Sequence, residues 1–95
     1  MFNVEYNKDS QIINLSGNLD SAKAEEVKSL LGKINNSITV DMSGLDFISS
    51  AGIGVMLLTY QRLKGIGENI YLVNLNENIK KVFRVSLLDK VFNIK

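Results

Sequence analysis

The sequence predicts an α/β fold in which helices pack on a β-sheet, and two observations support this. First, short stretches typical of strands alternate along the chain with stretches that carry apolar residues at helical spacing. Second, the 95 residues are 45% hydrophobic and 22% charged, which suits a folded domain with one core. We find no repeat, linker or low-complexity tract, and therefore expect one domain spanning residues 1–95.

The first half of the chain predicts a hairpin, a helix and a third strand. Residues 2–6 and 12–16 are expected to form the hairpin, after which the strand pattern breaks. Asp20 or Ser21 can then cap a helix by accepting hydrogen bonds from its first amides. Apolar residues recur along this helix at helical spacing, at Ala24, Val27, Leu31 and Ile34. The third strand is expected over residues 38–42, ending near Asp41.

The second half predicts a loop over residues 43–50 and a largely apolar helix over residues 51–64. Residues 70–75 are nearly all apolar, as expected for a strand covered on both faces. Asn76 can cap a third helix, and residues 91–94 are expected to add a last edge strand.

Composition narrows the classes of function. The chain has no cysteine and no histidine, so it lacks thiol nucleophiles, thiolate ligands and the commonest general base. Its net charge of +1 does not indicate a nucleic-acid binder. Its richest apolar run, residues 53–58, is far shorter than the ~20 residues that span a bilayer. With no export signal found, we expect a cytoplasmic binding protein that is not an enzyme, holds no cofactor or metal, contacts no nucleic acid directly and does not insert into a membrane.

The informative stretch is residues 41–55, which places Ser49 and Ser50 where the chain enters the second helix. A phosphate there would be stabilised, because the first amides of a helix lack partners and its dipole is positive at that end. Gly52 and Gly54 leave the first turn nearly bare of side chains, so another protein could approach closely. The alternative is structural, with the serines as caps and the glycines serving packing. We expect Ser49 to be the cap and Ser50 to be exposed.

The whole chain resembles the STAS domain family, and specifically its stand-alone anti-sigma factor antagonists. Residues 15–20 resemble the family's segment between the second strand and the first helix. Residues 40–42 and 45–55 resemble the phosphorylation loop and its helix, and residues 65–75 and 79–83 resemble the remaining strand and helix. The resemblance implies a STAS-like fold, a single mixed β-sheet of about four to five strands with about three helices packed on it.

The resemblance also implies a partner-switching function. In this family the unphosphorylated protein binds an anti-sigma factor, itself a serine kinase, and so frees a sigma factor. Phosphorylation of the serine matched here by Ser50 weakens that complex, and a serine phosphatase resets it. The matched positions that would bind the partner are Asp20, Ser49, Ser50, Gly52, Ile53 and Gly54. Asp20 would help present Ser50 to the kinase, although a role as a helix cap accounts for it equally well.

Three features depart from the family pattern. Many members carry an acid where this chain has Ser49, so Ser49 is the alternative phosphate acceptor. Ser86-Leu87-Leu88 stands where the family commonly has Ser-Gly-Leu, so the third helix must end without its glycine. No counterpart of the family's last helix is expected after Lys90.

Two other classes of function fit part of the sequence. In a phospho-acceptor receiver domain, Asp41 would take the phosphate, but that chemistry needs further acids for magnesium, and the first strand offers only Glu5. A STAS module without a phosphorylation role, acting as a fixed subunit of a membrane transport complex, is the other alternative.

Overall fold

The computed structural model describes residues 1–94, which form one mixed sheet with helices packed on it, as predicted. The strands are β1 (Phe2–Asn7), β2 (Ile12–Leu19), β3 (Ile38–Ile48), β4 (Ile70–Val73) and β5 (Asn93–Ile94). The helices are α1 (Ser21–Leu31), α2 (Ser50–Gly65), α3 (Glu77–Val85) and the short 3-10 helix η1 (Leu88–Lys90). The strands follow one another across the sheet in chain order. β1 is antiparallel to β2, and all other neighbours are parallel.

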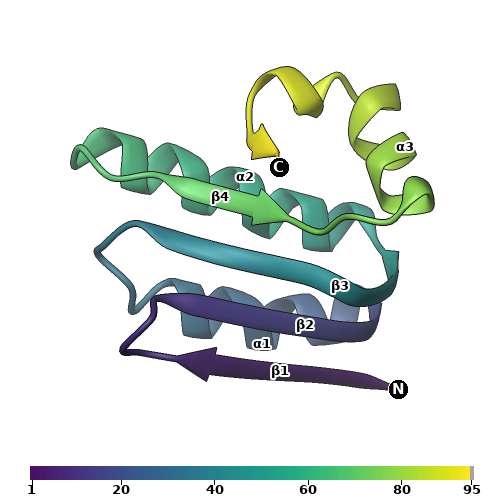
Figure 1. Cartoon of the computed structure of the whole chain (residues 1–95), viewed down its shortest axis with the longest axis horizontal. Helices are drawn as coiled ribbons and strands as arrows, with labels where there is room; N and C mark the ends of the chain where they lie inside the picture. Colours follow the sequence, from purple (N-terminus) through teal and green to yellow (C-terminus); the bar gives the residue numbers. More distant parts are fainter. Residues whose placement is uncertain (95) are drawn as a thin grey trace.

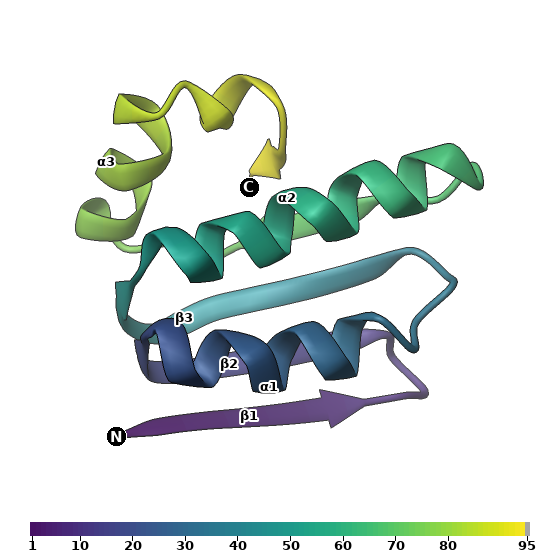
Figure 2. The ribbon, with the colours of Figure 1, turned by 180° about the vertical axis from the view of Figure 1, so that it is seen from behind.

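The two longest helices cover only one face of the sheet. α1 and α2 lie side by side behind the strands in Figure 1 and in front of them in Figure 2, and α3 lies beyond the carboxyl end of β4. The expectation that residues 70–75 are covered on both faces is therefore wrong. Ile70 and Leu72 face the helices and are buried, whereas Tyr71 and Val73 lie on the open face and are half-buried. Among residues 1–94, no helix has the length and apolar character needed to cross a membrane.

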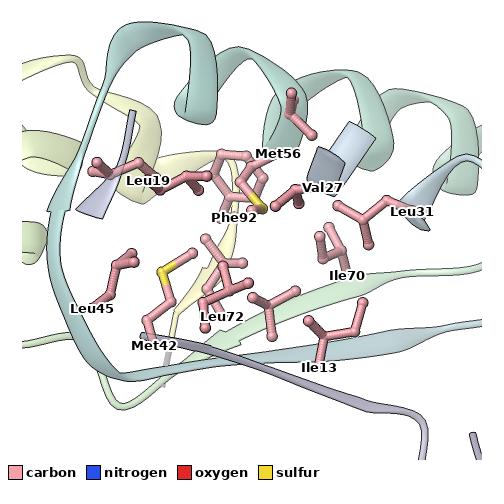
Figure 3. Close-up of a cluster of buried hydrophobic side chains, with 14 of the residues drawn as sticks. Ile13, Leu19, Val27, Leu31, Met42, Leu45, Met56, Ile70, Leu72 and Phe92 are labelled. Carbon is pink, nitrogen blue, oxygen red and sulfur yellow. The ribbon is translucent and has the colours of Figure 1, made fainter. Parts of the chain in front are cut away.

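The core lies between this covered face and the two helices (Figure 3). All four apolar positions predicted for the first helical segment are buried, although Ile34 lies just beyond the end of α1. Val55, Met56 and Leu63 of α2 are buried with them. The C-terminal segment joins this core through Phe92, whose ring packs edge-on against the rings of Phe83 and Tyr60. The distance between ring centroids is 5.6 Å in each pair. Burial of these side chains supplies the main driving force for folding.

β2 and β3 are both longer than predicted, and the expected loop over residues 43–50 is wrong. β3 continues to Ile48 and pairs with β2 through two register shifts. Glycines permit close approaches on both sides of β2. A Cβ on Gly44 would lie 2.7 Å from the Cβ of Ser16. Gly17 has φ of 83°, and a Cβ there would lie 1.8 Å from the carbonyl oxygen of Met1. The two segments in which the sequence predicted an end of the strand, after residue 16 and after residue 42, are therefore irregular parts of β2 and β3.

Arg62 of α2 fastens the carboxyl end of α1, an interaction that no sequence pattern indicated. Its guanidinium donates to the backbone oxygens of Leu31 and Ile34, at 2.7 and 2.8 Å, and to Oδ1 of Asn35 at 3.0 Å. The last carbonyls of a helix lack intrahelical donors and carry its negative dipole end, so a cation satisfies both needs.

We expect Arg62→Ala to lower the free energy of unfolding by about 2 kcal/mol, because it removes several charge-assisted hydrogen bonds. The free energy of unfolding of Arg62→Lys should lie between those of the unmodified protein and Arg62→Ala, since lysine keeps the charge but lacks the planar guanidinium with its several donors. Urea unfolding followed by circular dichroism measures both. Gln61→Ala, at the exposed neighbouring position, is the control and should change stability little. Equal losses for Gln61→Ala and Arg62→Ala would contradict this role.

α3 ends without a glycine, as predicted, because Leu87 itself adopts the left-handed conformation, with φ of 61°. This conformation costs a non-glycine residue roughly 1–2 kcal/mol. The side chain is 66% exposed, so little packing depends on it.

Leu87→Gly should therefore raise the free energy of unfolding by about 0.5–1 kcal/mol, the relief of strain less the larger entropy of unfolded glycine. Thermal unfolding measures the change. Val85→Gly is the matched control, since this exposed residue is helical and should lose stability on the same substitution. A loss for Leu87→Gly would show that the left-handed residue is not strained.

Candidate functional site

The site predicted from the sequence lies where β2 and β3 end and the chain enters α1 and α2. Leu19 and Ile48 are paired as the last residues of the two strands. The N–H of Ser49 then donates to the backbone oxygen of Leu19 at 2.9 Å. Because a helix follows each strand at once, α1 and α2 both begin at the same end of the sheet (Figure 2).

Asp20 and Ser49 are the N-caps of these two helices. The carboxylate of Asp20 accepts the N–H of Lys23 at 2.9 Å, and the hydroxyl of Ser49 accepts the N–H of Gly52 at 3.1 Å. The structural role considered for Asp20 is thus present, and its side chain is exposed. The expected cap role of Ser49 is confirmed.

A third capped helix begins at the same end of the sheet. Oδ1 of Asn76 accepts the N–H of Ile79 at 2.9 Å, as the sequence predicted for this cap. The amide nitrogen of Asn76 donates to the backbone oxygen of Leu45 at 2.8 Å and so joins the start of α3 to β3. The positive ends of three helix dipoles therefore lie at the carboxyl ends of the parallel strands.

Ser50 is the first residue of α2, and it is exposed, as expected. Ser49 uses its side chain and its carbonyl to accept the amides of Gly52 and Ile53. The amides of Ser50 and Ala51 have no intrahelical acceptor, because they belong to the first turn. A negative group on the Ser50 hydroxyl would meet these amides and the positive end of the helix dipole.

The two glycines of the first turn have different environments, which corrects one expectation. Gly52 is buried, and a Cβ there would lie 3.0 Å from Leu19 Cγ and from Ile48 Cγ1. It permits α2 to pack closely on the ends of β2 and β3 and offers no surface to a partner. Gly54 is half-exposed, and a Cβ there would have no neighbouring atom within 4 Å. Ile53 is half-buried against the core.

Two exposed apolar residues beside the site were not predicted from the sequence. Phe47 is 51% exposed although it lies in β3, and Leu58 of α2 is 55% exposed. Ser50, Gly54 and Leu58 follow one another at intervals of four residues, which places them along one side of the helix. This spacing is visible in the sequence, but apolar residues on much of the circumference of α2 obscured it.

Asp41 does not belong to this site. It lies within β3, where its carboxylate accepts the N–H of Ser43 at 2.9 Å and the side-chain amide of Asn74 at 3.1 Å. Partial burial alone would raise the pKa of Asp41, but the hydrogen bonds from Ser43 and Asn74 outweigh it and hold that pKa below its ordinary value. In residues 1–94 no group of three acidic side chains could hold a metal. The geometry thus gives no support to the receiver-domain alternative.

The sequence matches a family model and a known relative. The model of the STAS domain matches residues 1–95. BtrV of Bordetella bronchiseptica, a candidate anti-sigma factor antagonist, is 31% identical over 84 residues, which cover 84% of this chain and 72% of BtrV. The chain therefore belongs to the STAS domain family, as its motifs indicated.

Solved structures match the same fold. The crystal structure of tm1081 from Thermotoga maritima, a candidate anti-sigma factor antagonist, is 25% identical with a TM-score of 0.80, covering 99% of this chain and 85% of that one. The Bacillus protein SpoIIAA, solved in its phosphorylated form, is 21% identical with a TM-score of 0.71, covering 100% of this chain and 91% of that one. The likeness to SpoIIAA shows the fold alone, and the predicted STAS-like fold is confirmed.

Substituting the two glycines separately tests the geometry of the first turn. Gly54→Ala should raise the free energy of unfolding by about 1 kcal/mol, because alanine favours helix and its methyl group meets open space. The free energy of unfolding of Gly52→Ala should be at least about 1 kcal/mol lower than that of Gly54→Ala, since the added methyl group overpacks the buried Leu19 and Ile48. Chemical unfolding compares both. Equal stabilisation by the two substitutions would show that the packing around Gly52 is loose.

Proposed function

We propose that this protein is an anti-sigma factor antagonist whose binding is switched by phosphorylation of Ser50. In its unmodified form it binds an anti-sigma factor that is also a serine kinase, and so frees a sigma factor. Phosphorylation at Ser50 weakens that complex, and a serine phosphatase restores it. The chain acts as a binding module in the cytoplasm, and the kinase brings the ATP and magnesium.

The observation that carries this proposal is the difference between the two adjacent serines. The hydroxyl of Ser49 accepts a hydrogen bond from Gly52, so its modification would disrupt the cap of α2. Ser50 is exposed at the first position of the same helix, where a kinase can reach it. A relative supports the function, because BtrV, which is 31% identical to this chain, is a candidate anti-sigma factor antagonist.

The position of Ser50 explains how a phosphate would change binding without unfolding the protein. The first-turn amides and the helix dipole favour a negative group at this point, so the fold tolerates the modification. A partner fitted to the unmodified surface would instead meet an added charge of about −1.5 to −2 and three bulky oxygens. Asp20 caps α1 at the same end of the sheet, so a phosphate on Ser50 would add negative charge to an end that already carries one exposed carboxylate.

The proposed contact surface comprises Asp20, Ser50 and the side of α2 that carries Gly54 and Leu58. A neutral hydroxyl, a gap in side chains and an exposed leucine follow one another along that side. A partner could bury the exposed side chain of Leu58. Because Gly54 has no side chain, the partner's backbone could also approach α2 closely at that point. Ile53 and the Ser49 backbone lie beneath this surface, where Ile53 packs against the core. Gly52 contributes only the close packing of α2 on Leu19 and Ile48.

Ser50→Asp should weaken binding of the anti-sigma factor by about 100-fold, equivalent to roughly 3 kcal/mol, whereas Ser50→Ala should bind nearly as the unmodified protein does. A pull-down from lysate of the source organism, with partners identified by mass spectrometry, finds the kinase. Calorimetry with the purified kinase then gives the affinities. Retention of the same transporter subunits by all baits would favour the fixed-subunit alternative.

The modified residue is identified with the purified kinase and ATP. Ser50→Ala should abolish incorporation of acid-stable phosphate, while Ser49→Ala should still be phosphorylated although it loses about 1 kcal/mol of stability with its cap. Undiminished phosphorylation of Ser50→Ala would assign the site to Ser49.

A further inference from the structure

The outer edge of β1 is unpaired in the part of the chain that the structure describes. β1 is the first strand in the sheet order, and Figures 1 and 2 show nothing beyond it. An open strand edge presents N–H and C=O groups that can pair with another chain, and proteins usually protect it with lysine, proline or a bulge. Phe2–Asn7 contains neither lysine nor proline, its one charged side chain is Glu5, and its pairing with β2 has no register shift.

The register of the hairpin determines which backbone groups face outward. The N–H of Asn18 donates to the carbonyl oxygen of Met1, so these two residues form a hydrogen-bonded pair. Such pairs alternate along an antiparallel ladder, so Asn3 and Glu5 also direct their backbone groups toward β2. The backbone groups of Phe2, Val4 and Tyr6 consequently point away from the sheet.

We propose that a second copy of this chain pairs with this edge, antiparallel and centred on Val4. Only this register uses all three outward-facing residues, with Val4 opposite Val4 of the second copy and Phe2 opposite Tyr6. Each pair exchanges two backbone hydrogen bonds. The pairing is self-complementary and closes as a dimer with a two-fold axis, because each copy offers the same edge.

The side chains complement one another in the same register. Phe2, Val4 and Tyr6 are half-buried on the helix-covered face, so pairing places aromatic beside aromatic and valine beside valine and buries them further. On the open face Asn3 lies opposite Glu5 of the second copy, an amide against a carboxylate. The same two side chains already meet within one chain, at 3.3 Å. A register centred on Glu5 would instead place two carboxylates together.

The dimer is independent of the proposed switch, because it uses the edge of β1 and leaves α2 free. The two-fold axis runs perpendicular to the sheets, so the helices of both copies lie on one face of a continuous sheet. The two copies of Ser50 would then be displayed on the same side.

Substitutions at the exposed Asn3 test the charge pairing, with dissociation constants measured by sedimentation equilibrium. Asn3→Glu should raise the dimer dissociation constant about tenfold, because two like-charged pairs form across the two-fold axis. Asn3→Lys should lower it, since each lysine meets Glu5 of the second copy. Gln61→Glu, which adds a negative charge on α2, is the control and should have no effect. A protein that stays monomeric up to millimolar concentration, or equal constants for both Asn3 variants, would overturn the proposal.

Single cysteines test the register, because the chain has none of its own. Asn3 and Glu5 of opposite copies form a non-hydrogen-bonded pair with Cα atoms at about 4.5 Å, within the range of about 4.4–6.8 Å that a disulfide spans. Each of these residues lies diagonally from its own copy at about 7–8 Å, beyond that range. Mild oxidation should therefore cross-link an equimolar mixture of the Asn3→Cys and Glu5→Cys proteins and neither variant alone, on a non-reducing gel. Equal cross-linking of either variant alone would overturn the proposed register.

Discussion

The parallel pairing of β2 with β3 over their full length is the constraint on which the rest of this structure depends. It ends at Leu19 and Ile48, and the hydrogen bond from the Ser49 N–H to the Leu19 oxygen extends it to the first residue beyond the strands. Since each strand leads directly into a helix, this register also fixes the relative position of α1 and α2. Two register shifts are needed to reach it, and Gly44 supplies the space in which a side chain would collide with Ser16 of β2.

The chemistry of the site follows from that constraint. Three helices begin at one end of the sheet, and each has its own polar cap, which accepts one of the free amides in the first turn of its helix. Because Ser49 provides the cap of α2, the side chain of the neighbouring Ser50 is not needed to cap the helix and can carry a modification. The buried Gly52 permits the start of α2 to pack closely against Leu19 and Ile48, which fixes the position of the backbone that carries Ser50.

Local signals in the sequence predicted those parts of the fold that depend on local interactions. The caps of Asp20, Ser49 and Asn76 and the buried face of α1 follow from residue type and spacing, and the structure contains all of them. The length of β3 could not be predicted in this way, because only its pairing with a distant strand makes Ser43 to Ile48 extended. The contact of Gly52 and the bonds of Arg62 to the end of α1 likewise join segments far apart in the chain.

These contacts also determine what kind of switch the site can be. α2 is held at its start by the close packing of Gly52, along its length by Val55, Met56 and Leu63, and near its end by Arg62. A phosphate on Ser50 would contact none of these groups, so no alternative arrangement of the helix would be favoured by it. On the proposed function, the partner must therefore sense the charge itself at the contact surface. Aspartate supplies about one negative charge where phosphoserine supplies about −1.5 to −2, so it imitates the sign of the effect more closely than its size.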